Sequence, residues 1–256
     1  MEFDLENHRD FWRIHGVNYR DSIQPVDLSK KLLRPMTQNE SIIYSINALQ
    51  NNRFRAASMP LYHSVFTSLF RNIRSKKGKD IEKIRKFLYE SINNFISTLT
   101  RVEYNPSGID KIIHNCNIPG QYEIAGNFVG PDEFVKNTSN QAVYKALLGT
   151  DDTQEINEIY KWICGNNPFL WRVNHRPENQ DICVAGFGAS SGADLWCCGD
   201  PRDSDSALGV RDSVSAGGAA QNSEAYTQEQ ISTALNKLGC SDLEKTLISE
   251  LTKTSK

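Results

Sequence analysis

The alternation of apolar and polar positions divides the chain into a helical first part and a strand-rich second part. In segments 36–50, 59–74 and 80–99, apolar residues recur every three or four positions, the period of helices with one buried face. The first of these segments opens with Thr37 and has Glu40 three residues later, which is the pattern of a capping box. We therefore expect three helices, followed by a boundary between residues 97 and 117.

Beyond the boundary, short apolar stretches alternate with turns rich in Gly and Pro, and one further helix is expected over 150–165. Four short strands should follow, from the stretches FLWRV, CVAGFGAS, ADLWCC and ALGVR. The predicted class is α+β. We expect an amino-terminal helical domain over 1–110, a second domain with a small antiparallel sheet over 111–215, and a flexible linker with a short helical tail over 216–256.

The two faces of the expected late strands differ in chemistry. One face should be core and includes Phe187 and Leu195, because side chains alternate across a strand. The other face lacks the Lys, Glu and Thr of an ordinary solvent face and mixes small, acidic, thiol and indole groups. We take that side as the candidate ligand-binding set, which comprises Gly186, Gly188, Ser190, Ser191, Gly192, Asp194, Trp196, Cys198, Asp200, Asp203 and Asp205.

These stretches, closed by Pro-Arg-x-Ser-x-Ser-Ala-Leu-Gly-Val-Arg, resemble the C-terminal part of the C-type-lectin-fold variable proteins that diversity-generating retroelements rewrite. The resemblance covers about 117–214 and is most specific over 169–211. In that family a reverse transcriptase changes adenine-containing codons before a final Gly-Val-Arg strand. Asn codons altered at their adenines yield Asp, Ser, Gly and Cys, which matches most of the candidate set. Trp196 departs from this palette, since no Asn codon reaches Trp by adenine changes alone.

The resemblance implies a C-type-lectin-like second domain and a non-catalytic ligand-binding function. Its hypervariable recognition surface would bind a protein or another macromolecule, because an open sheet face suits a broad partner. The helical tail lies beyond the resemblance, and its apolar stripe after a linker indicates an element that packs on the first helices or binds a partner protein. For the amino-terminal helices no family is indicated.

Each candidate residue also has a structural interpretation. Asp200, Asp203 and Asp205 could be turn residues that accept hydrogen bonds from local backbone donors. Trp196 could pack against a neighbouring loop instead of facing a ligand. Cys198 has no basic residue near it in sequence that would activate its thiol, so a nucleophile is not indicated.

Neither a cofactor nor a catalytic site is expected. Calcium is the remaining alternative, because the aspartates at 200, 203 and 205 supply oxygen ligands, although the EF-hand spacing is absent. The Glu-Pro-Asn motif of sugar-binding lectins is not present in its usual form. The adjacent Cys197 and Cys198 do not reproduce the separated cysteine pair of formylglycine-generating enzymes, and no hydrolase, zincin or nucleotide-binding motif occurs.

A cluster of positive charge between the second and third helices carries the alternative function. Arg71, Arg74, Lys76, Lys77, Lys79, Lys83, Arg85 and Lys86 would make it a contact for nucleic acid or an acidic partner. The simpler interpretation is a solvated corner between two helices, since no aromatic residues alternate with the charges to stack on bases.

The overall composition limits these choices. The net charge of -2 argues against nucleic-acid binding by bulk charge, and 39% apolar residues are typical of a globular protein. The amino terminus lacks the pattern of a secretory signal and no stretch is long enough to span a membrane, so a cytoplasmic protein is the default expectation, with surface display through a partner left open. The six cysteines are expected to be reduced thiols.

Overall fold

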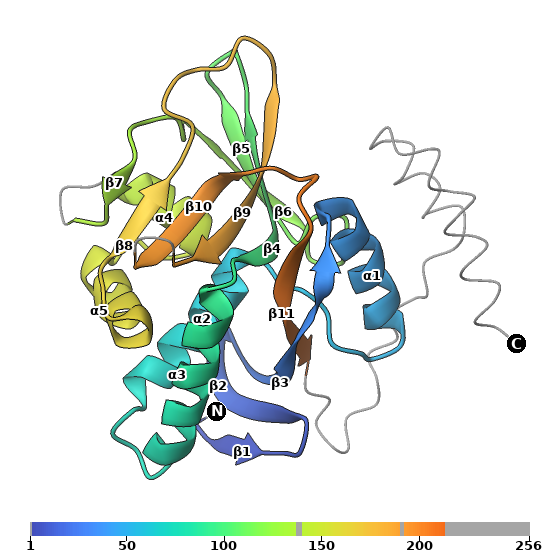
Figure 1. The fold of residues 1–256 in the computed structure, drawn as a ribbon, viewed down its shortest axis with the longest axis vertical. Coiled ribbons are helices and arrows are strands. Elements are labelled where there is room, and N and C mark those ends of the chain that lie inside the picture. Colours follow the sequence, from blue (N-terminus) through green and yellow to red (C-terminus); the bar gives the residue numbers. More distant parts are fainter. Residues whose placement is uncertain (1, 137–139, 190–191, 213–256) are drawn as a thin grey trace, which may run out of the picture. The chain divides into compact units, whose positions relative to one another are not determined.

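A mixed sheet of 11 strands, covered by five helices, forms the part of the chain that the computed structural model describes, residues 2–136, 140–189 and 192–212 (Figure 1). These residues all belong to one compact unit, 1–213. The linker and helical tail expected over 216–256 lie outside the described residues, as do Ser190 and Ser191.

The sheet takes its strands from both halves of the chain, in the order β1-β2-β3-β11-β4-β9-β10-β8-β7. The hairpin of β5 and β6 pairs with β4 outside this path. The strand bounds are β1 Leu5–Asn7, β2 Phe11–Tyr19, β3 Ser22–Met36, β4 Ile96–Tyr104, β5 Asp110–His114, β6 Tyr122–Gly126, β7 Glu133–Phe134, β8 Pro168–Trp171, β9 Asp181–Gly188, β10 Ala193–Gly199 and β11 Asp205–Asp212.

The four late strands predicted from the sequence are present as β8 to β11, but they do not form a small antiparallel sheet. β10 pairs with β8 in parallel, and β11 pairs in parallel with β4 through Ser206 and Ile96. β11 also runs antiparallel to β3, which lies more than 160 residues earlier in the chain. The expectation of a small, purely antiparallel sheet was therefore wrong, because long-range pairing joins these strands to the amino-terminal ones.

The five helices are α1 Gln38–Gln50, α2 Met59–Arg71, α3 Gly78–Ile92, α4 Gln141–Leu148 and α5 Thr153–Cys164. The capping box is confirmed, since the Thr37 side chain accepts from the backbone N–H of Glu40 and the Glu40 carboxylate accepts from the backbone N–H of Thr37. α5 ends, as predicted, at Gly165, which adopts the left-handed conformation with φ 84°. The sequence did not predict α4.

The amino-terminal helical layout differs from the sequence prediction in two places. Residues 5–36 form β1 to β3, with a tight turn in which Arg20 and Asp21 both have positive φ. The third helix ends at Ile92 instead of Leu99, and the apolar residues after it enter β4, where they pair with β9. The helices therefore pack on a sheet that both halves of the chain build, and the expected separate helical domain is not observed.

The main core lies between the sheet and α2, α3, α4 and α5. Phe66 of α2 packs against Tyr160 of α5 and Phe187 of β9, and all three side chains are fully buried. Tyr62 of α2 donates a hydrogen bond to the carbonyl of Leu208 in β11 and so joins helix to sheet. A smaller core lies under α1, which Figure 1 places beside β3 and β11.

Within the described residues, no helix is both long and apolar enough to cross a membrane.

Candidate ligand-binding face

Five aromatic side chains from the region around β7, β8 and β10 form a continuous row, which we call the aromatic row. Ring centroids are separated by 4.8 Å between Phe134 and Phe169, 4.8 Å between Phe169 and Trp171, and 5.1 Å between Trp171 and Trp196. Phe95, which precedes β4, meets Trp196 edge-on at 6.0 Å. Phe134 is 49% exposed and the other four rings are partly exposed. Partly exposed aromatic rings in contact form a rigid apolar surface.

Strand pairing brings these rings together. Trp171 and Trp196 are partners in the parallel pair β8–β10, and Phe134 is the partner of Phe169 in β7–β8. Phe169 and Trp171 are two residues apart, so they share one face of β8. The residue between them, Leu170, is fully buried in the main core together with Leu195 of β10. The aromatic row therefore lies on the face of these strands that points away from the main core.

Glycines in the neighbouring strand provide the space that the row occupies. A Cβ at Gly186 would lie 2.7 Å from both Phe95 Cζ and the carbonyl oxygen of Ile96. A Cβ at Gly188 would lie 2.7 Å from Trp196 Nε1. Both glycines are buried. The prediction that Gly186 and Gly188 face a ligand was wrong, because Phe95 and Trp196 cover them.

Asp194 also lies on this face, but it is only 1% exposed. Its Oδ1 accepts a hydrogen bond of 3.1 Å from the indole Nε1 of Trp171. A buried carboxylate with an indole donor fixes the orientation of the ring. The prediction that Asp194 is an exposed ligand contact was therefore wrong, and its observed contact is with Trp171.

Trp196 combines the two interpretations that the sequence left open. Its ring stacks on Trp171 with an interplanar angle of 10°, and Phe95 packs against its other side. It nevertheless stays partly exposed, between Trp171 and Phe95 in the aromatic row. Packing between two rings holds Trp196 in one orientation without covering it.

The aspartates of the turn between β10 and β11 have local partners. Asp200 accepts hydrogen bonds from the guanidinium of Arg202 and, with a smaller effect, from the backbone N–H of the same residue, which together lower the pKa of its carboxyl to about 2. Asp203 is exposed, and its backbone N–H donates to the carbonyl of Asp200. Asp205 begins β11, and burial raises the pKa of its carboxyl. The turn interpretation is confirmed for Asp200, while Asp203 and Asp205 remain candidate contacts.

The other candidates divide between the strand and the loop before it. Cys198 is half-buried, and burial, followed by the charge of Asp132, raises the pKa of its thiol to about 11. It is therefore a thiol, not a reactive thiolate, near neutral pH. Gly192 has a φ of 135°, and a Cβ there would lie 3.0 Å from the side chain of Asn166. Nothing in the described structure places Ser190 or Ser191.

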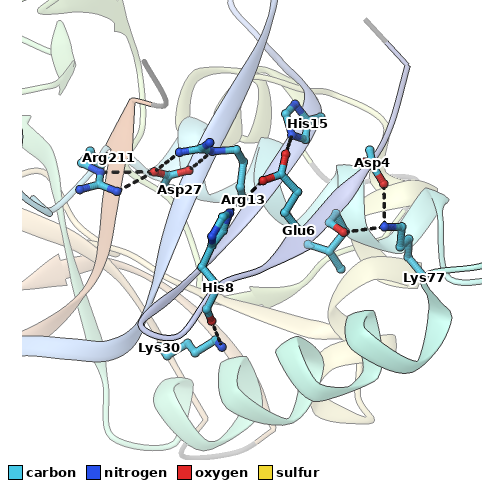
Figure 2. Close-up of polar contacts among 10 residues, drawn as sticks. Asp4, Glu6, His8, Arg13, His15, Asp27, Lys30, Lys77 and Arg211 are labelled. Atoms are coloured by element: carbon cyan, nitrogen blue, oxygen red, sulfur yellow. Dashed lines mark hydrogen bonds and ion pairs between the residues drawn. The ribbon is translucent and has the colours of Figure 1, made fainter. Parts of the chain in front are cut away.

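The closing Leu-Gly-Val-Arg stretch is part of the core and of a buried ion-pair cluster. Arg211 donates to Oδ2 of Asp27 at 2.8 Å, and Arg13 donates to both carboxylate oxygens of the same residue (Figure 2). The Asp27 side chain is 1% exposed. Val210 is buried in the main core, and Gly209 lies against Ser29 of β3. This stretch thus fixes β11 to β2 and β3.

The cluster of positive charge between α2 and α3 is largely paired. Arg71 makes a two-pronged contact with Glu155 of α5, at 2.6 and 2.9 Å, and Lys77 pairs with Asp4 beside β1 (Figure 2). Further pairs within α3 join Lys83 to Asp80, Arg85 to Glu82 and Lys86 to Glu90. A cation that is already paired with a carboxylate attracts a phosphate backbone less strongly, so this pairing weakens the cluster as a nucleic-acid contact.

The sequence prediction found Trp196 but missed Phe95, Phe134, Phe169 and Trp171. The signal for two of them was present, since the stretch FLW places Phe169 and Trp171 on one face of a predicted strand. Their neighbours in space depend on the register of β8 and β10, which no local pattern specifies.

Within residues 2–136, 140–189 and 192–212, no group of three or more His, Cys, Asp or Glu side chains is arranged to hold a metal ion. Five cysteines in these ranges are free thiols.

Comparison with known proteins gives little further information. No known protein family and no curated protein matches the sequence. A solved structure described as "Accommodation of massive sequence variation in Nanoarchaeota by the C-type lectin fold" aligns with 67% of this chain and 93% of its own, at 11% sequence identity and a TM-score of 0.37.

Proposed function

We propose that this chain is a non-catalytic ligand-binding protein with a C-type-lectin-like fold, and that the aromatic row is the fixed centre of its recognition face. The observation that supports this is a row of five rings in contact, one exposed and four partly exposed, on a sheet face that lies opposite the main core. Apolar residues that are exposed singly are common on globular proteins, whereas a contiguous exposed apolar patch usually marks an interaction site.

The shape of this face favours a macromolecular partner. Small-molecule sites are usually concave, whereas this row extends from the edge strand β7 across β8 to β10. Aromatic rings that neighbours hold in place lose little entropy on binding, which is why Trp and Tyr dominate the energetics of many interfaces. Trp196 and Trp171 have this arrangement, and Asp194 fixes the latter.

We further propose that retroelement mutagenesis diversifies residues around this row. The resemblance of the late strands and of the Leu-Gly-Val-Arg closure to variable proteins supports this proposal. The test is to sequence the surrounding locus. A near-copy of the segment encoding residues 182–211, with adenines wherever it differs from the gene, beside a reverse transcriptase gene, is the expected result. A locus without such a copy would contradict the diversification proposal while leaving the aromatic row to be tested separately.

The binding face itself is tested by a matched pair of substitutions. Phe134→Ser removes the most exposed ring of the row, and Tyr89→Ser removes an aromatic ring that is 42% exposed on α3. Immobilised wild-type protein and both variants are incubated with extract of the source cells, and retained proteins are quantified by mass spectrometry. We expect one partner to be lost with Phe134→Ser and kept with Tyr89→Ser. Equal retention by all three proteins would rule out the aromatic row as the recognition face.

The alternative function uses the cluster between residues 71 and 86, where Arg74, Lys76 and Lys79 have no ion-pair partner within the described part of the chain. Salt dependence separates the two functions. Retention of the partner through the aromatic row should change little between 50 and 200 mM salt, whereas binding through phosphate contacts would fall by about tenfold or more.

A further inference from the structure

A polar cleft of about 570 Å³ lies away from the aromatic row, between α2, the β2–β3 turn, β6 and the segment that joins α4 to α5. Its floor is one face of α2, where Ser64, Thr67, Ser68 and Arg71 follow one another at helical spacing. The rest of α2 packs in the main core. The polar stripe therefore faces the cleft on an otherwise buried helix.

Arg20 is a cation already oriented at this cleft. Its guanidinium lies over the ring of Tyr122 at 4.1 Å and donates one hydrogen bond to the carbonyl of Gly120. No carboxylate in the described ranges is within ion-pair distance of it. A guanidinium has five N–H donors, so a group held in this way keeps donors free for a further acceptor.

The other charged residues of the cleft largely neutralise one another. Arg71 is held by Glu155, and Lys145 lies 3.3 Å from Asp151. Asp21 follows Arg20 in the turn and belongs to the lining, whereas Asp151 does not. Three basic and three acidic side chains therefore meet at the cleft, and Arg20 is the basic side chain without an ion-pair partner among those described.

His63 of α2 supplies a second, independent feature of the same cleft. It lines the cavity, it is 3% exposed, and neither ring nitrogen has a hydrogen-bond partner in the described structure. Burial, followed by the charge of Arg71, lowers the pKa of the imidazole to about 4, so the ring is neutral near pH 7. A neutral imidazole offers one donor and one acceptor, and leaving both unused in a buried position is costly.

The second buried histidine of the chain shows the usual arrangement. His114 lies 3.0 Å from the hydroxyl of Thr100 through Nδ1 and 2.8 Å from the carbonyl of Ala146 through Nε2. Both of its ring nitrogens are thus satisfied by protein atoms. Unused hydrogen-bonding groups on His63, at a cavity that also holds a pre-oriented cation, indicate a site that a ligand completes.

We propose that this cleft binds a small anionic solute, with an oxyanion group contacting Arg20 and a polar group hydrogen-bonded to His63. The oxyanion is a phosphate or a carboxylate, both of which accept paired hydrogen bonds from a guanidinium. The hydroxyl of Ser64 suits a solute with its own hydroxyl groups. The hydroxyl oxygens of Thr67 and Ser68 can still accept from such a solute, while their O–H groups donate to the carbonyls of His63 and Gly16. This site is separate from the aromatic row and does not depend on the function proposed for it.

The test uses the full chain, labelled with ¹⁵N, in a phosphate-free buffer at constant ionic strength. Glycerol 3-phosphate, glycerate and glycerol are added in turn, because they share a small polyol body and differ in the anionic group. Imidazole ¹⁵N signals are followed by NMR. We expect the His63 signals to move with one of the two anions and not with glycerol, while the His114 signals stay in place.

Two substitutions show whether the effect depends on Arg20. Arg20→Asn keeps a residue that tolerates the positive φ of 50° and removes the cation, and it should weaken the apparent Kd about tenfold or more. Arg53→Gln removes an exposed charge that is not part of the cleft and should leave the Kd unchanged. Movement with glycerol 3-phosphate alone assigns a phosphate site, and movement with glycerate alone assigns a carboxylate site. No movement with either anion, or equal weakening by both substitutions, would overturn the proposal.

Discussion

Removing the guanidinium of Arg211 should destabilise the protein through the buried carboxylate of Asp27. Arg211 contributes hydrogen bonds of 2.8 and 3.3 Å to Oδ2, and its guanidinium lies 4.7 Å from the Phe54 ring centroid. In Arg211→Gln, Asp27 keeps its bonds to Arg13 but loses half of its charge compensation while staying 1% exposed.

The expected loss follows from these contacts. A hydrogen bond to a charged group contributes about 1.5–3 kcal/mol, and the contact with the ring adds about 0.5–1 kcal/mol. The two bonds of Arg211 share one acceptor oxygen and do not add in full, so we expect Arg211→Gln to cost about 2–3 kcal/mol. Asp27→Asn should cost more, about 3–5 kcal/mol, because it leaves two guanidinium groups facing each other without their carboxylate.

Urea unfolding at 25 °C, followed by far-UV circular dichroism, measures these losses. With a slope of about 2–3 kcal/mol per M, Arg211→Gln should lower the midpoint by about 1 M. The variant that combines Arg211→Gln with Asp27→Asn should lose less stability than the two single variants lose in sum, because both substitutions remove the same interaction. Arg202→Gln serves as the control, since it removes an exposed arginine that also pairs with an aspartate, and its midpoint should not move.

A midpoint for Arg211→Gln equal to that of Arg202→Gln, with an unchanged slope, would refute this reasoning. It would mean that Arg13 alone compensates Asp27, and that the closing Arg has no structural role.

Three further results are expected. Gly186→Ala should lower the free energy of unfolding by about 1–3 kcal/mol in the same urea assay, because the new Cβ would lie 2.7 Å from the carbonyl oxygen of Ile96. An unchanged midpoint would refute the close packing of this face. The ring centroids of Trp171 and Trp196 are 5.1 Å apart, so far-UV circular dichroism should show a coupled pair of indole bands that Trp196→Phe abolishes. A spectrum that the substitution leaves unchanged would contradict the stack. His63 and His114 both have a pKa lowered to about 4 by burial, so between pH 6.5 and 4 the unfolded chain binds protons that the folded chain does not. The free energy of unfolding should therefore fall as the pH drops through this window, and His63→Phe should reduce the slope of that free energy against pH by up to about 1.4 kcal/mol per pH unit. An unaltered slope would count against a buried neutral ring at His63.

Local sequence pattern predicted the helices best where one face is apolar and a cap is present. Thr37 and Glu40 define the start of α1, and the stripe of α2 is read correctly from spacing alone. The end of α3 was misread because Phe95 and Ile96 continue the helical spacing, while Ile96 in fact pairs with Phe187 of β9. That pairing joins residues 91 positions apart, and its stabilisation is not visible in a local window.

The candidate site was predicted in part for the same reason. The alternation of side chains along β10 correctly predicted that Trp196 points away from the core, because the sequence of a single strand is enough to divide its residues between the two faces of the sheet. It could not show that Trp171 stacks on this ring, which depends on the parallel register of β8 and β10. Asp194 was misassigned because an unpaired carboxylate is normally exposed, and its indole partner comes from another strand.

Packing on this face also limits which residues diversification can change under the proposed function. Side chains larger than Gly at 186 or 188 would displace Phe95 or Trp196, so variation there would damage the aromatic row it is meant to supplement. Asp203 is exposed and Asp205 is half-buried at the start of β11, so both can change without loss of core packing. Adenine-rich codons in a template copy are therefore expected at positions 203 and 205 and not at 186 and 188. The aromatic rings would then supply constant apolar contact, and the turn before β11 would supply the part of recognition that changes.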